Sequence, residues 1–77
     1  MMKTGMLWFD NDPLTDLPAK VQAAAAYYHR KYGIAPDLCF VNPGVLPPSG
    51  GASREIDIQP NRLVMPNHLW LGIRERP

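Results

Sequence analysis

The chain has 77 residues, of which 45% are hydrophobic and 19% are charged, and its formal net charge is +1. This composition argues against a disordered chain, which has too few apolar side chains to form a core, and the length fits one small domain over residues 1–77. The nearly balanced charge excludes the strong positive field that usually accompanies nucleic-acid binding. Because a domain of this size buries only about 60–65% of the surface of its unfolded chain, self-association would be a plausible source of added stability.

Two further features of the composition concern the cellular compartment. Cys39 is the only cysteine, which excludes an intrachain disulfide and fits a reducing environment, and we expect it to be a small buried residue in a strand. The first ten residues, MMKTGMLWFD, contain an apolar run too short for a signal peptide or a membrane span. We therefore expect a cytoplasmic protein.

The first expected element is a short apolar strand over Gly5–Phe9, which the turn-forming sequence DNDP ends. A helix over Leu17–Tyr32 follows. Pro18 is tolerated in its first turn, Asp16 or Thr15 can cap its amides, and Gly33 can take the left-handed conformation after its last turn. Spacings of three and four predict one apolar face, made of Leu17, Val21, Ala24, Ala25, Tyr28 and Tyr32.

The second half of the chain favours strands. Asp37–Val41 is apolar on both faces, which is typical of a central strand. A long Pro/Gly-rich loop at 42–53 separates it from Arg54–Gln59, which alternates polar and apolar residues and so predicts a strand with one wet face.

A hairpin and a final strand complete the predicted sheet. Pro60 and Asn61 occupy the centre of a turn signal, Leu63–Met65 would be the returning arm, and His68–Arg74 would be the last strand. We therefore expect an α+β fold in the order β-α-β-β-β, with one amphipathic helix packed on a small, largely antiparallel sheet.

Residues 64–73, VMPNHLWLGI, resemble the metal-binding strand of the His-hydrophobic-His family of single-strand DNA nucleases and REP-associated transposases. In that family a Pro-Asn-His turn leads into a strand whose two histidines, two residues apart, hold a divalent metal. The resemblance implies that His68 would be the first ligand, but Trp70 stands at the second position, and an indole nitrogen has no lone pair to offer. The family's nucleophilic tyrosine follows this strand, whereas the tyrosines of this chain precede it: Tyr27, Tyr28 and Tyr32.

Other candidate chemistry is equally incomplete. Asp10, Asp12, Glu55 and Asp57 could converge with His68 in a metal-dependent phosphodiesterase, but nothing in their spacing requires this, and each fits a turn or the wet face of a strand. The loop GVLPPSGGAS lacks the lysine of a phosphate-binding loop, although its Pro47 and Pro48 could serve as a docking segment. We assign no catalytic, cofactor-binding or metal-binding residue.

The sequence YYHRKYG, residues 27–33, interleaves basic and aromatic side chains, an arrangement that can follow a phosphate backbone while stacking on bases. Our leading hypothesis is nevertheless a non-catalytic binding or assembly module that associates with a protein partner or with itself. A sheet edge or an aromatic patch that includes Trp8 and Trp70 would serve such association. The alternative is a nucleic-acid-binding protein that uses the helix end, with Tyr27, His29, Arg30 and Lys31, and surface arginines. The candidate partner or nucleic-acid surface comprises His29, Arg30, Lys31, His68 and Trp70.

Overall fold

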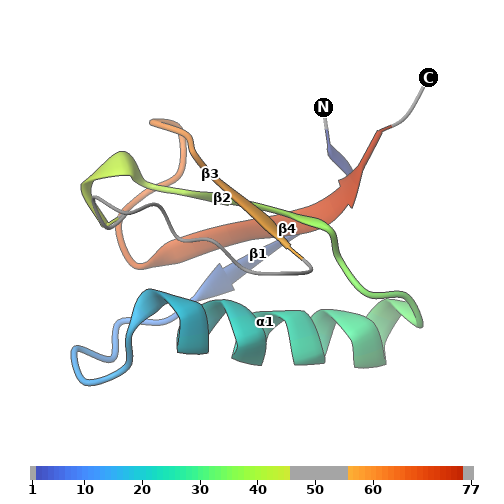
Figure 1. Cartoon of the computed structure of the whole chain (residues 1–77), viewed down its shortest axis with the longest axis horizontal. Coiled ribbons are helices and arrows are strands. Elements are labelled where there is room, and N and C mark those ends of the chain that lie inside the picture. Colours follow the sequence, from blue (N-terminus) through green and yellow to red (C-terminus); the bar gives the residue numbers. More distant parts are fainter. Residues whose placement is uncertain (1, 46–55, 76–77) are drawn as a thin grey trace.

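The computed structural model describes residues 2–45 and 56–75 and places them in one sheet with one helix. Helix α1 lies along one side of the sheet, as the expected α+β architecture requires (Figure 1). The elements follow one another as β1 (Met2–Phe9), α1 (Leu17–Tyr32), β2 (Leu38–Val41), the 3-10 turn η1 (Pro43–Val45), β3 (Asp57–Pro60) and β4 (His68–Arg74). Within the described residues, no helix combines the length and the apolar character needed to cross a membrane.

The strands stand in the order β1-β4-β2-β3. Strand β4 lies between β1 and β2 and is antiparallel to both, so β1 and β2 run parallel to each other without touching. Strands β2 and β3 pair in parallel. The prediction of a largely antiparallel sheet is therefore confirmed, and so is the central position expected for β2, which has a partner on each side.

Helix α1 begins and ends where local chemistry predicts. The Asp16 carboxylate accepts a hydrogen bond from the Ala19 amide at 3.0 Å, so Asp16 rather than Thr15 is the cap. Gly33 takes a φ of 74° and donates its amide to the His29 carbonyl at 2.8 Å, which closes the last turn.

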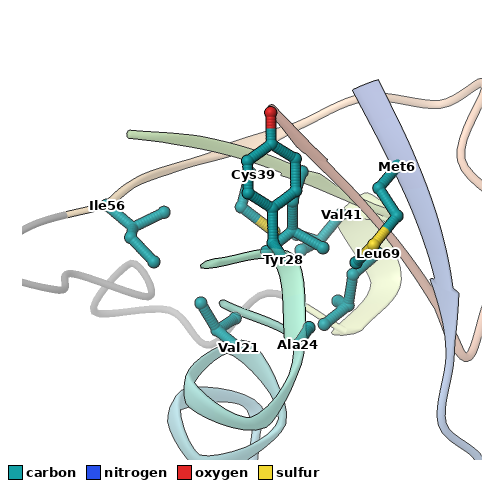
Figure 2. Packing of buried hydrophobic residues seen from close by; sticks show 9 residues of the cluster. Met6, Val21, Ala24, Tyr28, Cys39, Val41, Ile56 and Leu69 are labelled. Atoms are coloured by element: carbon teal, nitrogen blue, oxygen red, sulfur yellow. The ribbon is translucent and has the colours of Figure 1, made fainter. Parts of the chain in front are cut away.

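The core lies between α1 and the strand residues that face it. Figure 2 shows Val21 and Ala24 of the helix below the strands, and the Tyr28 side chain extending from the helix up to Cys39 of β2; Val41 of β2 belongs to the same cluster. The same cluster contains Met6, Ile56, Leu69 and Leu71. Of the six residues expected on the helix face, Val21, Ala24 and Tyr28 are buried, Leu17 and Ala25 pack partly buried against the core, and Tyr32 is exposed.

Cys39 is buried in this core, as expected, and burial raises the pKa of its thiol to about 12. Since the thiolate is the reactive form, the folded protein should not react with a thiol reagent, and labelling should proceed only as fast as the chain unfolds. A Leu63→Cys variant, whose thiol replaces an exposed side chain, should label its new site at once and serves as the control.

The raised pKa of the Cys39 thiol also makes the stability depend on pH. Because the thiol ionises more readily in the unfolded chain than in the folded one, the free energy of unfolding should fall as pH rises from about 9 toward 12.

Strand β1 is longer than expected because it continues past an irregularity. Its register against β4 shifts between Lys3 and Met6, and Thr4 adopts a φ of 51°, which places it in the left-handed region. The Tyr28 hydroxyl donates a hydrogen bond to the Thr4 carbonyl at 2.6 Å. The helix therefore fixes the position of the bulge in the edge strand.

The segment after β3 differs from the predicted hairpin. Leu63–Met65 forms no strand; residues 61–67 instead make consecutive turns, in which the Asn61 side chain accepts the Leu63 amide at 2.9 Å. The Asn42 side-chain amide donates to the Val64 carbonyl at 3.0 Å, which holds these turns against the end of β2. Strand β3 can thus pair in parallel with β2, because the chain uses residues 61–67 to cross to the start of β4 rather than to return beside β3.

The Pro/Gly-rich loop predicted at 42–53 is described only in part. Asn42 and η1 belong to the described chain, and Asn42 accepts the Gly44 amide at 2.8 Å. Residues 46–53, with Pro47 and Pro48, lie outside the described residues, as do Arg54 and Glu55.

Candidate functional site

The sheet face that no described helix covers carries the largest exposed aromatic and aliphatic side chains of the described strands. Alternation along each strand sends Met6, Cys39 and Leu69 toward α1 and their neighbours to the other side. We call this other side the open face and define it by Leu7 and Phe9 of β1, Phe40 of β2, Asp57 and Gln59 of β3, and His68, Trp70 and Arg74 of β4.

Among the apolar side chains of the open face, exposure is greatest at the β1 side. Leu7, Phe9 and Trp70 are 56%, 58% and 39% exposed, whereas Leu38, which alternation also places on this face, is only 3% exposed. Since Leu7 pairs with Trp70 across the ladder, these side chains form one apolar patch over β1 and β4. Such a patch has the character of an interaction surface.

The Trp70 indole lies against the backbone of β1 at Gly5. A Cβ atom built on Gly5 would lie 2.8 Å from Trp70 Nε1 and 2.9 Å from Trp70 Cε2, which is closer than side-chain atoms approach. Only glycine therefore lets the ring rest there. Trp70 is held on the sheet while more than a third of it remains accessible.

Phe9 and His68 form a second ordered pair of rings on this face. Their centroids are 5.1 Å apart and their planes are tilted by 54°. His68 Nδ1 lies 2.9 Å from the Pro66 carbonyl oxygen; because a carbonyl can only accept, Nδ1 is the donor in this contact. His68 and Trp70 are two residues apart in β4 and lie on the same face of the sheet, as the sequence predicts.

The charges of the open face lie at its far end and are paired. The Arg74 guanidinium donates to the Asp57 carboxylate, and Gln59 donates to the same carboxylate oxygen at 2.6 Å. The Gln59 hydrogen bond, followed by that of Arg74, holds the pKa of Asp57 below its ordinary value. Among the open-face side chains that the structure describes, no cation is left unpaired to meet a phosphate.

The three helix-end candidates lie on a different surface. His29, Arg30 and Lys31 are exposed residues of α1, which covers the side of the sheet opposite Trp70. Arg30 lies 6.0 Å from the centroid of the Tyr27 ring, and Lys31 lies 5.4 Å from that of Tyr32. The five candidate residues from the sequence are therefore divided between two surfaces, three on the helix and two on the open face.

A small cavity of about 190 Å³ lies where β1 ends and β4 begins. Asp10 and His68 both line it, together with Lys20, whose ammonium donates to the Asp10 carbonyl at 3.2 Å and lies 4.0 Å from the Asp10 carboxylate. The other lining residues are Thr15, Leu17, Val45, Asn67 and Leu69. Lys20 thus ties the helix to the loop after β1.

The acidic residues considered for a metal site do not gather. Asp12 accepts from the Thr15 hydroxyl and the Leu14 amide within its own loop, and the Thr15 hydrogen bond is the main cause of its lowered pKa. Asp57 lies on β3 beside Arg74, and Glu55 is outside the described residues. In the described part of the chain, no three histidine, cysteine or acidic side chains come together as metal ligands.

Sequence reasoning missed Gly5, Leu7 and Phe9 as members of the candidate surface. The segment GMLWF is apolar at every position after its glycine, so its pattern does not reveal which residues face the helix. The pairing of β1 with β4 supplies that information. Comparisons of the chain with family models, curated proteins and solved structures gave no match.

Proposed function

We propose that the protein is a small binding module that receives a protein partner on the open face of its sheet. The observation that carries this proposal is the exposure of Leu7, Phe9 and Trp70 together on a face that no described helix covers. Aromatic side chains are the residues on which protein interfaces most depend. An apolar partner surface fits this patch best.

Preorganisation of the rings supports the same function. Trp70 rests on Gly5, and Phe9 rests on His68, so neither side chain needs to lose much rotamer freedom when a partner covers it. Ordering flexible side chains at an interface costs entropy, and this cost lowers the affinity. A sheet with fixed aromatic rings therefore binds more tightly than its small area alone suggests.

The distribution of charge favours a protein partner over nucleic acid. Phosphate contacts supply much of the affinity of nucleic-acid-binding proteins, and the described cation of the open face, Arg74, is engaged by Asp57. The helix end does interleave cations with aromatic rings, as the alternative hypothesis requires. There, however, Arg30 and Lys31 lie over the rings of Tyr27 and Tyr32, which are the rings that bases would stack on.

Site-specific photo-cross-linking in the source cells tests the proposal. A photoreactive residue at Phe9 should capture a protein other than a second copy of the chain, and the same residue at Leu63, 91% exposed in the turn after β3, should not capture that protein. With that partner purified, Trp70→Ala should weaken binding by roughly 30-fold or more, the effect of losing about 2 kcal/mol at a hot spot, and Leu63→Ala should leave affinity unchanged. Capture of nucleic acid at Phe9, equal capture at both positions, or unchanged affinity of Trp70→Ala would refute the proposal.

A further inference from the structure

The outer edge of β1 presents backbone groups whose direction can be deduced from the ladder. The Asp10 amide donates to the Asn67 carbonyl at 2.8 Å, and these two residues stand opposite each other in the register that also pairs Trp8 with Leu69 and Met6 with Leu71. In an antiparallel pair, hydrogen-bonded and non-hydrogen-bonded positions alternate. Met6 and Trp8 therefore bond to β4, while the amides and carbonyls of Leu7 and Phe9 point away from the sheet.

The two edges of the sheet differ in how readily they accept another strand. Strand β3 has four residues and ends in Pro60, which has no amide hydrogen to donate. Strand β1 has eight residues, and its stretch 5–9 carries no charge, the feature that most often protects an edge. No described segment of the chain pairs with the outer side of β1.

We propose that two copies of the chain pair through their β1 edges in antiparallel orientation, with Trp8 of one copy opposite Trp8 of the other. In this register Leu7 of each copy faces Phe9 of the other, and the outward groups of these residues meet as four hydrogen bonds. A shift by two residues would use either Gly5, next to the bulge, or Asn11, beyond the end of β1. The register centred on Trp8 is the one that uses only regular strand.

Charge complementarity favours a second copy as the occupant of this edge. Lys3 lies toward one end of β1, and Asp10 and Asp12 follow its other end. Antiparallel pairing brings the lysine end of each copy toward the aspartate end of its partner, whereas parallel pairing would align like charges. An apolar centre with opposite charges at its ends is therefore complementary to itself under a two-fold axis.

The bulge limits the length of this contact. The Tyr28 hydroxyl holds the Thr4 carbonyl, and the register is irregular between Lys3 and Met6, so the ladder cannot extend far past Gly5. A short ladder makes the association reversible and concentration-dependent. The pairing also places the Leu7 and Phe9 side chains of both copies side by side, which joins the two open faces into one surface. A monomer with an intact open face would still bind a partner, so failure of the edge pairing would leave the proposed binding function untouched.

The experiment combines molar mass with amide exchange at several concentrations. We expect light scattering to show the mass rising toward that of a dimer by about 1 mM. Once the total concentration exceeds the dissociation constant about tenfold, roughly a fifth of the chains remain monomeric, so the Leu7 and Phe9 amides should exchange about fivefold more slowly. The Met6 and Trp8 amides, which bond to β4, should exchange at a constant rate. A monomer mass throughout, or unprotected Leu7 and Phe9 amides in a dimer, would overturn the edge pairing.

Cysteine cross-linking tests the register. Since facing residues of a ladder have Cα atoms about 5.5 Å apart, a mixture of Leu7→Cys and Phe9→Cys proteins should form the mixed disulfide in preference to either symmetric one. Cys39 is buried and does not compete. Predominance of a symmetric disulfide would overturn the register, and a dimer that Trp70→Ala dissociates would assign the contact to the open face instead.

Discussion

Replacement of Tyr28 by alanine is expected to destabilise the domain by about 3–5 kcal/mol, the usual cost of removing a large aromatic side chain from a core. Tyr28 is fully buried, extends from α1 into the core cluster shown in Figure 2, and contacts the Tyr32 ring with centroids 4.6 Å apart. For 77 residues, a total stability of about 4–12 kcal/mol is typical. Urea denaturation followed by circular dichroism should therefore show Tyr28→Ala unfolding at a much lower urea concentration than the wild type.

The phenol of Tyr28 has an effect that can be separated from the packing of its ring. Tyr28→Phe keeps the ring but removes the 2.6 Å hydrogen bond to the Thr4 carbonyl, which should cost about 1 kcal/mol. Burial, with smaller effects of Tyr32 and Asp37, raises the pKa of this phenol, so it stays a donor over the ordinary pH range. Tyr32→Phe, on a partly exposed ring, should change the stability by less than about 0.5 kcal/mol. Equal stability of Tyr28→Phe and the wild type would show that the phenol does not hold the bulge.

The helix could be predicted to the residue because its determinants are local. Asp16 caps the first turn, Gly33 closes the last one, and the apolar spacing between them identifies the buried side, all from side chains within one segment. The bounds of strand β4, His68 to Arg74, could also be predicted from the sequence. Local sequence, however, did not specify its place between β1 and β2, because an apolar strand accepts a neighbour on either edge.

The predicted hairpin was wrong because the turn signal did not determine the next partner. Pro60 and Asn61 fit a tight turn, but the Asn61 amide bonds to the Val41 carbonyl and its side chain caps the following turn at Leu63. These contacts couple β3 to β2, which lies 16 or more residues earlier in the chain. Parallel pairing over such a separation leaves no local pattern in the sequence.

Only the β4 part of the candidate surface could be predicted, again because the pairing between strands is not encoded locally. The period of two within β4 places His68 and Trp70 on one face, and this follows from sequence alone. Whether a helix covers that face depends on where α1 packs, and the choice between Leu7 and Trp8 as the exposed residue of β1 depends on the register with β4. The structure also separates these residues from His29, Arg30 and Lys31, which sequence reasoning grouped with them.

Replacement of Gly5 by alanine is expected to lift the Trp70 indole off the sheet. The added Cβ would lie within 3.0 Å of three indole atoms, and β1 is held by its ladder with β4, so the ring is the part that moves. Gly33 is the positive-φ glycine of the described chain, and Gly5 has no such conformation, so the substitution tests the contact rather than backbone strain. Loss of the buried part of the indole should cost about 1–2 kcal/mol.

Fluorescence can follow the ring directly, since Trp8 and Trp70 are the two tryptophans and Trp8→Phe leaves Trp70 as the reporter. In that background Gly5→Ala should shift the Trp70 emission to longer wavelength and increase its quenching by acrylamide, while the far-ultraviolet circular dichroism stays that of the folded domain.

A double-mutant cycle gives the control. In a Trp70→Ala background, Gly5→Ala should hardly change the free energy of unfolding, because the indole atoms that the new Cβ would displace are gone. Equal destabilisation in both backgrounds, with unchanged quenching, would mean that Gly5 does not support the ring. The predicted result would make Gly5 a positioning residue for Trp70, so Gly5→Ala should weaken partner binding about as much as Trp70→Ala, and the two effects should not add.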